Sequence, residues 1–386
     1  MKGKRIALAV SLACVLALVL GARWVFMQTE KDEAAPEWRP GASINKEDLK
    51  IGVIHLTDPL NEKGGYSYAH EAGIREAQQK TGLTDGQIIR KNNVGNTNLY
   101  EVEHAMRECI AEGARVIIAT SWEHMDACEK LAAEYPSVIF TNASGYKQND
   151  TNFTNYFGRI YQARYLSGIA AGLKTESGKI GYVAAMGKDN SEVTGGIDAF
   201  AIGVESVNRD ARIYVKVTER WYDPAEEANA AKSLIALGCD VIAQHCDTVN
   251  PQIEAQRAGV WGVGYNSDLR EDIPGTVIVS VVWNWGAYYA RLIESVIDGS
   301  FTTAPYFGGI SDGIVGLTSL DETLLPPGAA LAVEEARERI ASGEFDVFSG
   351  VMETNDGRFV GSEGETLPDS EITQGIDWYY RNVAEQ

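Results

Sequence analysis

The feature that most constrains the fold is an alternation of short apolar runs with longer helical stretches, which occurs twice along the chain. The first series begins with LKIGVIHL at 49–56, and the second begins with GKIGYVAAM at 178–186. Short apolar runs are typical of buried strands, and a helix between successive strands makes those strands parallel. We therefore expect an α/β fold with two parallel-sheet lobes that form an internal pseudo-repeat.

The two series predict the following elements. In the first, we expect strands at 49–56, 88–94, 115–120 and 137–142, and helices at 65–80, 99–111 and 125–135. In the second, we expect strands at 178–186, 211–218, 240–246, 261–266 and 276–282, and helices at 192–207, 224–237 and 251–258.

The remaining segments define how the lobes are connected. Residues 152–173 are expected to cross between the lobes and to open with a helix, and a helix from Trp285 to Ile297 should return the chain to lobe one. Asn355-Asp356-Gly357 predicts a hairpin that could lean on lobe one near the hinge. We assign 49–150 together with 286–386 to lobe one, and 151–285 to lobe two.

The N-terminus is typical of an exported protein. Basic residues precede an uncharged, mostly apolar run from Ile6 to Ala22, as in a signal peptide. Cleavage near its end would release the protein, whereas 17 residues are also the lower limit for a membrane-spanning anchor. A lipoprotein modification at Cys14 is less favoured. We interpret 1–28 as signal peptide or anchor and 29–48 as a linker. The domain would then lie in the periplasm or on the outer face of the membrane, which it contacts only through the N-terminal segment.

The charge of the chain excludes one class of partner. The sequence has 34 Lys and Arg against 54 Asp and Glu, which gives a net charge of −20. Such a chain repels phosphate backbones, so we expect no nucleic acid partner.

The four cysteines beyond Cys14 are expected to be buried free thiols. Cys239 and Cys246 flank one expected strand and would lie about 20 Å apart. Cys109 and Cys128 fall at different heights on two neighbouring helices, and no C-x-x-C spacing indicates metal or redox chemistry.

Aromatic and acidic residues follow most of the expected strands. In parallel α/β sheets, ligands lie outside the carboxyl ends of the strands, so two facing lobes place a site in the cleft between them. The residues at these ends are Thr57-Asp58, Gly64-Gly65-Tyr66, Ser121-Trp122 and Asn142 in lobe one, and Met186–Asn190, Trp221-Tyr222-Asp223, His245-Cys246-Asp247, Asn266-Ser267-Asp268 and Trp283-Asn284-Trp285 in lobe two.

This composition suits a flat ligand that forms hydrogen bonds, such as a nucleobase, because aromatic rings stack and carboxylates accept N–H donors. A sugar would also stack, although sugar sites usually carry a denser set of polar groups. A single aromatic residue after a strand more often covers the core than binds a ligand.

Signatures of enzymes are absent or weak. The five histidines have no metal-ligand spacing, Gly64-Gly65 is not followed by Gly-Lys-Ser/Thr, and no G-x-S-x-G occurs. We therefore expect no enzyme, no metal and no cofactor. A nucleoside hydrolase that uses a pair of acids stays as an alternative.

Several motifs in order resemble the basic membrane protein family, from about residue 49 to the C-terminus: GYSYAHEAG (65–73), LAAEYPSVIFTNASG (131–145), NYFGRIYQARYLSGIAAG (155–172), GKIGYVAA (178–185), WYDPAEEANAAKSLI (221–235), DVIAQHCD (240–247), GVGYNSD (262–268) and SVVWNWGAYY (280–289). These are extracytoplasmic substrate-binding proteins of ABC transporters, and characterised members bind purine nucleosides. The resemblance implies a two-lobed periplasmic-binding-protein fold of type I, like that of ribose-binding proteins, and an ABC permease as partner.

The resemblance also implies roles for individual residues. Tyr66 corresponds to a base-stacking aromatic and Asp58 to an acidic residue after the first strand. Trp122 and Asp126 lie in a segment similar to the loop whose Asp helps to hold the ligand. In lobe two, Phe200 matches an aromatic residue of the family, and Trp221 is the other candidate for the second ring that stacks on the ligand. Asp268 matches an Asp of the family that is associated with ribose.

One departure concerns the sugar. Where nucleoside-binding members have Ser-x-x-Lys, this chain has Ser280-Val-Val-Trp283. We expect Trp283 to replace a cationic ribose contact, so that a free nucleobase is preferred over a nucleoside; alternatively, Trp283 only repacks. Ligand closure would bring Tyr66, Asp58 and Trp122 against Trp221, His245, Asp268 and Trp283. A ligand sensor coupled to a membrane receptor is a further alternative.

Overall fold

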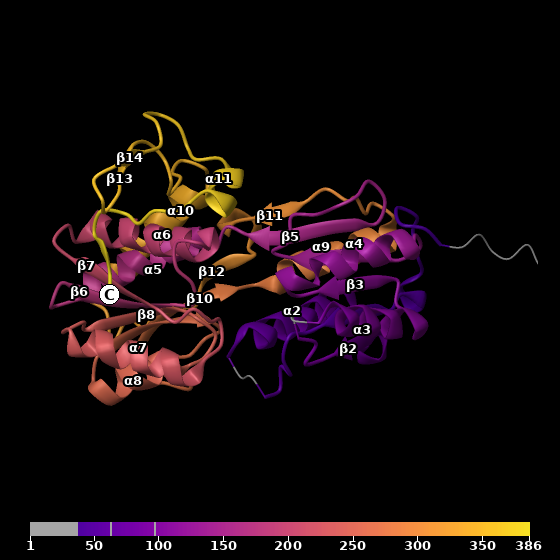
Figure 1. The fold of residues 1–386 in the computed structure, drawn as a ribbon, viewed down its shortest axis with the longest axis horizontal. Helices are drawn as coiled ribbons and strands as arrows, with labels where there is room; N and C mark the ends of the chain where they lie inside the picture. Colours follow the sequence, from indigo (N-terminus) through magenta and orange to yellow (C-terminus); the bar gives the residue numbers. More distant parts are fainter. Residues whose placement is uncertain (1–37, 62–63, 96–97) are drawn as a thin grey trace, which may run out of the picture.

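The computed structural model describes residues 38–61, 64–95 and 98–386. The predicted signal peptide or anchor and most of the linker lie outside these residues. Figure 1 shows two lobes side by side along the long axis, with the chain passing between them in the middle. The expected α/β fold with two parallel-sheet lobes is confirmed.

Lobe one is a six-stranded parallel sheet in the order β11-β5-β4-β3-β1-β2. Its strands are β1 (Ile51–Ile54), β2 (Ile88–Lys91), β3 (Val116–Ala119), β4 (Ile139–Ala143), β5 (Phe153–Gly158) and β11 (Tyr306–Gly308). Its helices are α2 (Tyr66–Thr81), α3 (Leu99–Ala111), α4 (Met125–Glu134) and α9 (Trp285–Asp298), with short 3-10 turns η1 (Lys46–Asp48), η2 (Asp85–Gln87) and η3 (Trp122–His124).

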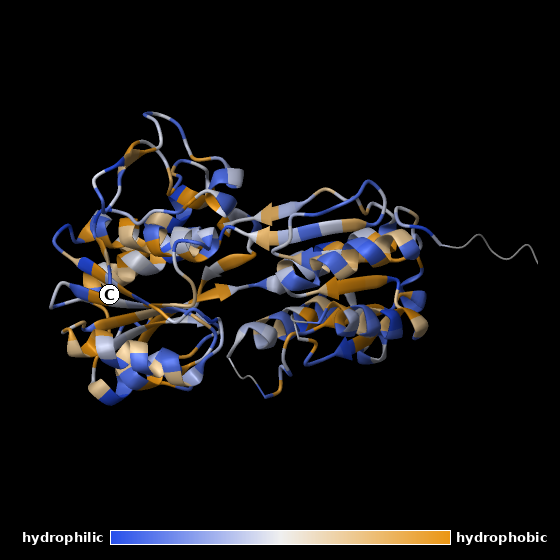
Figure 2. Ribbon diagram, viewed as in Figure 1, coloured by the Kyte–Doolittle hydropathy of each residue, from blue (hydrophilic) through white to orange (hydrophobic). Residues whose placement is uncertain are grey.

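Helices cover both faces of this sheet, which explains why its strands are continuous apolar runs. In β3, Val116 and Ile118 belong to the cluster that contains residues of α2 and α9, whereas Ile117 belongs to the cluster beneath α3 and α4. Figure 2 shows the resulting pattern, with hydrophobic strands inside and hydrophilic helix surfaces outside.

Lobe two is a seven-stranded sheet in the order β12-β10-β9-β8-β6-β7-β15, parallel except for β12. Its strands are β6 (Lys179–Ala184), β7 (Arg212–Val217), β8 (Val241–His245), β9 (Trp261–Asn266), β10 (Val277–Trp283), β12 (Val315–Leu317) and β15 (Val383–Glu385). Its helices are α5 (Ile160–Lys174), α6 (Ser191–Val207), α7 (Pro224–Ala236), α8 (Asn250–Ala258), α10 (Ala329–Ala341) and α11 (Asp369–Gln374), with the 3-10 turn η4 (Ile310–Asp312).

Local sequence signals set the ends of several helices. Asn98, Asn190 and Asp223 cap α3, α6 and α7, each accepting a backbone N–H of the first turn through its side chain. Close packing of α5 on α6 depends on two glycines, because a Cβ at Gly168 or Gly203 would lie 2.1 Å from a backbone oxygen of the facing helix.

The described chain crosses between the lobes three times: at 158–160, at 283–285 and between β11 and β12. Residues 152–173 therefore open with a strand, β5, and not with a helix. This strand was missed because polar residues interrupt FTNYFG, although both faces of the sheet bury it.

The C-terminal region differs from the expected assignment of 286–386 to lobe one. Helix α9 and β11 do join lobe one, but β12 pairs with β10 and β15 pairs with β7, so the end of the chain lies on lobe two. Figure 1 shows this segment in yellow above α5 and α6. Strands β13 (Met352–Glu353) and β14 (Phe359–Val360) form the predicted hairpin, which leans on lobe two instead of lobe one.

The four cysteines outside the N-terminal run are free and buried, as predicted. Within residues 38–61, 64–95 and 98–386, none of the helices combines the length and the apolar content needed to span a bilayer.

Candidate functional site

The two lobes touch across the gap between them. The Ser267 hydroxyl of lobe two donates a hydrogen bond of 3.1 Å to the carbonyl oxygen of Gly64 in lobe one. Gly64 has φ +86°, and a Cβ there would lie 3.1 Å from the Ser267 hydroxyl oxygen and 3.3 Å from Leu269. A glycine is therefore needed for the backbone before α2 to lie directly against lobe two.

Tyr66, the first residue of α2, follows the Gly64 segment that lies against lobe two. Burial raises the pKa of its phenol well above the ordinary value, and the carboxyls of Glu192 and Asp247 raise it further. Both carboxyls, together with the nearby Tyr265, belong to lobe two. The residue predicted to stack a ligand from lobe one is therefore within electrostatic range of acidic and aromatic residues of the other lobe.

His245 lies at the centre of the part of the candidate site that lobe two provides. It ends β8 and is fully buried, with its ring in edge-to-face contact with Trp221 (5.7 Å) and Tyr265 (4.9 Å). Burial lowers the pKa of His245 well below its ordinary value, and the charge of Arg164 lowers it further. The imidazole is therefore neutral at physiological pH.

Two acidic residues lie at this carboxyl edge of the sheet, and Glu192 is the one next to the imidazole. Glu192, in the first turn of α6, places Oε1 3.7 Å from Nε2 of His245. Burial raises the pKa of Glu192 to about 7, although Arg164 opposes the shift. Asp247 accepts a hydrogen bond of 2.9 Å from Nδ2 of Asn266, a residue held at φ +68° at the end of β9.

A stack of aromatic rings connects the lobes beside this cluster. Trp283, at the end of β10, lies parallel to Trp285 at 4.5 Å, and Trp285 lies parallel to His70 of α2 at 4.3 Å. Nε1 of Trp283 donates to the Tyr265 hydroxyl at 2.9 Å. The indole of Trp283 is therefore fixed at the crossing and almost fully buried.

A hollow of about 330 Å³ lies between α2 and lobe two. Lobe two and the crossing contribute Asn266, Ser267, Asp268, Val282, Trp283, Asn284, Trp285, Leu317 and Thr318, and α2 contributes Tyr68, Ala69, Ala72, Gly73 and Glu76. Asn266 thus lines the hollow and also binds Asp247.

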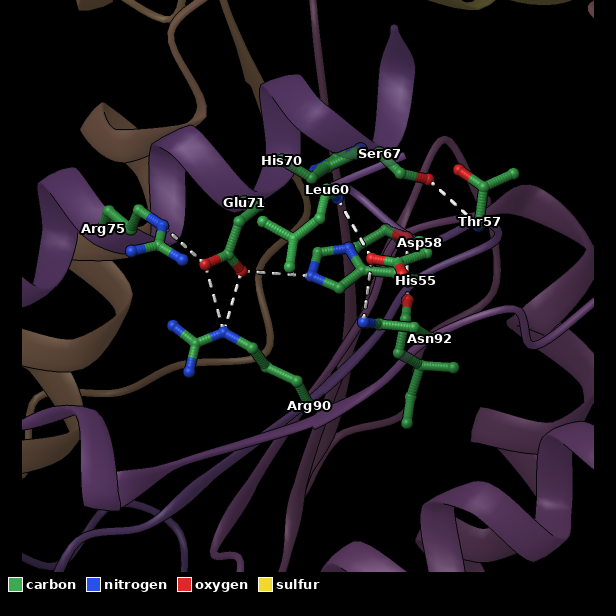
Figure 3. A network of polar contacts seen from close by, with 12 residues as sticks. His55, Thr57, Asp58, Leu60, Ser67, His70, Glu71, Arg75, Arg90 and Asn92 are labelled. Atoms are coloured by element: carbon green, nitrogen blue, oxygen red, sulfur yellow. Dashed lines mark hydrogen bonds and ion pairs between the residues drawn. The ribbon is translucent and has the colours of Figure 1, made fainter. Parts of the chain in front are cut away.

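A polar network fixes the position of α2 on lobe one. Figure 3 shows the Glu71 carboxylate between three cationic or polar partners: Arg75 at 2.8 Å, Arg90 at 2.9 Å and Nε2 of His55 at 3.4 Å. Burial opposes ionisation, but hydrogen bonds from His55 and Arg90 lower the pKa of Glu71 to about 2. The helix that presents Tyr66 is thereby anchored to β1 and β2.

The structure brings some of the predicted site residues together. Tyr66, Trp221 and His245 lie around one cluster, and Asp268 and Trp283 line the hollow next to it. Asp268 also forms an ion pair with Arg270.

Four predicted residues have other surroundings. Phe200 is fully buried, and its ring is in edge-to-face contact with Tyr182 at 5.3 Å, so its stacking on a ligand stays a prediction. Trp122 is half exposed, and Asp126 is paired with Lys147. Asp58 accepts from the backbone of Leu60 and the amide of Asn61, which stabilises its own loop (Figure 3 shows the contact with Leu60).

The sequence interpretation missed Glu192, Tyr265 and Arg164. An acidic residue in the first turn of a helix usually indicates favourable interaction with the helix dipole, so Glu192 gave no separate signal. Tyr265 and Arg164 lie inside apolar stretches, which predict positions in the hydrophobic core and not in a site. Among the described residues, no group of three or more His, Cys, Asp and Glu side chains is placed to hold a metal ion.

Comparison with known proteins covers both lobes. The family described as ABC transporter substrate-binding protein PnrA-like matches residues 50–332. A purine-binding protein of Brucella abortus is 32% identical over 343 residues, which are 89% of this chain and 95% of the relative. A putative ABC transporter glucose-binding protein of Haloferax volcanii is 36% identical over 290 residues, which are 74% of this chain and 71% of the relative.

Solved structures agree in fold. A solute-binding protein of an ABC transporter system from Conexibacter woesei has a TM-score of 0.66 and covers 77% of this chain and 98% of its own, at 19% identity. A solute-binding protein from Aeropyrum pernix also has a TM-score of 0.66 and covers 77% of this chain and 92% of its own, at 18% identity. The two-lobed periplasmic-binding-protein fold is thus confirmed.

Proposed function

Because the chain belongs to the family of PnrA-like ABC transporter substrate-binding proteins, we propose that it binds a purine nucleobase or nucleoside between its lobes and delivers it to an ABC importer. Proteins of this family act outside the cytoplasm, and the family and the Conexibacter woesei structure are those of solute-binding proteins, not enzymes. The nucleoside hydrolase and the receptor-coupled sensor are therefore not favoured. Attachment through the N-terminal segment and docking on a permease are parts of the proposal.

One observation carries the proposed ligand class: Tyr66 of lobe one lies within electrostatic range of Glu192, Asp247 and Tyr265 of lobe two, next to the contact between Gly64 and Ser267. An aromatic ring from one lobe and carboxyls from the other are what a flat ring with N–H donors needs for stacking and for hydrogen bonds. The name of the Brucella abortus relative supports a purine.

The proposed mechanism is ligand-stabilised closure. A ligand that contacts Tyr66 on one lobe and the His245 cluster on the other favours the closed arrangement, because only that arrangement offers both sets of contacts. The contact between Ser267 and Gly64 would then form together with ligand binding.

Trp283 supports a preference for the base over the nucleoside. Its indole is stacked on Trp285 and bonded to Tyr265, so it occupies this position rigidly and offers no charge to ribose hydroxyls. We propose that a free nucleobase binds more tightly than its nucleoside.

Two measurements test the proposed function. Mass spectrometry of the ligand released from the purified protein is expected to detect a purine. Competition calorimetry is expected to rank adenine, guanine or xanthine above guanosine and inosine. Release of glucose and no purine would contradict the ligand class, whereas tighter binding of guanosine or inosine would contradict only the role of Trp283.

A further inference from the structure

Glu192 and His245 face each other without completing a hydrogen bond. The distance from Oε1 of Glu192 to Nε2 of His245 is 3.7 Å, which is longer than a hydrogen bond. Nε2 of His245 is fully buried and has no hydrogen-bond partner in the described part of the chain. Because an unsatisfied buried polar group is costly, this nitrogen indicates a partner that the chain itself does not supply.

The imidazole is held firmly in this orientation. Its Nδ1 lies 3.5 Å from the Tyr182 hydroxyl on the side away from Nε2. Gly196 of α6 lies directly over the ring: a Cβ there would come within 3.0 Å of both Cε1 and Nδ1. The ring therefore cannot turn to bury Nε2 elsewhere without moving α6.

A fully buried cation stands behind the pair. Arg164 of α5 donates through Nη1 to the carbonyl of Gln244 at 2.6 Å, and its Cζ lies 4.2 Å from the centre of the Tyr265 ring. Its charge acts on both Glu192 and His245. An internal ion pair between Glu192 and His245 is therefore unfavourable, since a second positive charge on the imidazole would lie near this guanidinium.

The pair is also directed towards the other lobe. Glu192 keeps 24% of its side chain exposed, and its carboxyl acts on Tyr66 of lobe one. A ligand that stacks on Tyr66 would thus bring its edge to Glu192 and His245.

We propose that Glu192 and His245 together determine specificity, the carboxylate accepting an N–H of the ligand and Nε2 of the imidazole pairing with the adjacent polar atom of the same ring. This assignment rests on the proposed function. It requires an uncharged planar heterocycle that carries an N–H next to a second polar atom. A 6-oxopurine offers N1–H beside its carbonyl, and a 6-aminopurine offers an exocyclic N–H beside a ring nitrogen. An anionic ligand is disfavoured, because Asp247 and ionised Glu192 would repel it.

Calorimetry on the full chain, dialysed free of ligand, tests this assignment with hypoxanthine, adenine and glucose. Glu192→Gln keeps the shape of the side chain and removes its charge. We expect the affinity for the preferred purine to fall about 10- to 100-fold, since hydrogen bonds to charged groups are the stronger ones. The ratio between hypoxanthine and adenine is expected to change as well, because the amide offers a donor where the carboxylate offered an acceptor.

Glu226→Gln is the matched control. Glu226 also lies in the first turn of a lobe-two helix, α7, but is exposed, and its substitution is expected to leave purine binding within about 2-fold. Gly196→Ala is a second test that leaves Glu192 in place: the added methyl displaces the His245 ring, so purine affinity is expected to fall and the hypoxanthine-to-adenine ratio to shift. Melting curves check that each variant is folded.

The outcomes separate the two proposals. Wild-type binding of glucose and of neither purine would overturn the proposed function, and the assignment of the ligand N–H with it. Purine binding by the wild type that is equally tight and equally selective in Glu192→Gln would overturn the role of this pair and leave the proposed function standing.

Discussion

The hydroxyl of Ser267 donates a hydrogen bond of 3.1 Å to the carbonyl oxygen of Gly64, and this contact joins the two lobes directly. The backbone at Gly64 adopts φ +86°, which only glycine takes up without strain. The contact fixes the start of α2, and thus Tyr66, against the carboxyl edge of the lobe-two sheet. The contact between the lobes and the position of Tyr66 therefore both depend on the backbone from Gly64 to Tyr66.

Gly64→Ala is expected to weaken ligand binding by about 5-fold. The methyl group strains the backbone by about 1 kcal/mol or more and crowds Ser267 and Leu269, so the closed arrangement loses free energy. Calorimetry with the preferred ligand measures the change. The control is Gly364→Ala, where φ is +75° but nothing lies within 4 Å of the added methyl; its affinity should equal that of the wild type. Equal affinity in both variants would mean that the Gly64 contact does not take part in closure.

Tyr66→Ala is expected to cost about 5- to 100-fold in purine affinity, as removal of a base-stacking ring does elsewhere. Tyr66→Phe should bind nearly as well as the wild type, since the ring remains. Tyr68→Ala is a useful comparison because Tyr68 lies on the same helix and lines the hollow. A larger loss for Tyr68→Ala than for Tyr66→Ala would place the ligand in the hollow and not beside His245.

Glu192 is expected to make the folded protein less stable as pH rises from about 4.5 to about 7. Burial raises the pKa of Glu192 in the folded protein to about 7, although the charge of Arg164 lowers it. Between these pH values the folded state therefore holds a proton that the unfolded state has already lost. The effect amounts to at most about 3 kcal/mol. Denaturant unfolding across this pH range should show a smaller decline for Glu192→Gln. An identical pH dependence in both proteins would contradict the burial of this carboxyl.

Glu71 has the opposite pH dependence. Hydrogen bonds from His55 and Arg90 outweigh burial and lower its pKa to about 2, so its stabilising contribution is present above about pH 4.5 and is lost as pH falls towards 2. Glu71→Gln should lower the free energy of unfolding at pH 7 by about 2 to 3 kcal/mol, because Arg90 loses its buried partner. Glu334→Gln removes an exposed pair with Arg337 and should cost less than about 0.5 kcal/mol. Chemical denaturation that gives the same loss for both would refute the network in Figure 3.

Much of the fold could be predicted from the sequence, because each lobe follows local rules. Buried parallel strands require continuous apolar runs, and the capping residues Asn98, Asn190 and Asp223 mark helix starts. The short strands β11, β12 and β15 could not be found this way. They are three residues long and are strands only because a sheet edge is available to them.

The sequence predicted which residues of the candidate site follow the strands. It did not predict which residues of each helix point towards the site. Tyr66, Trp221 and His245 were found because parallel strands end at one edge. The surroundings of Phe200 could not be predicted, because its motif does not set the rotation of α6. That rotation is determined by tertiary packing, where Gly203 lets the backbone of α5 approach closely and turns Phe200 into the core.

A crystal structure of the protein with its preferred purine shows directly which residues of the two lobes hold the ligand. We expect the purine ring to stack on Tyr66, with one edge within hydrogen-bond distance of Glu192 and of Nε2 of His245. A purine found in the hollow beside Glu76 and Asp268, away from Tyr66 and His245, or bound to one lobe alone, would contradict this arrangement.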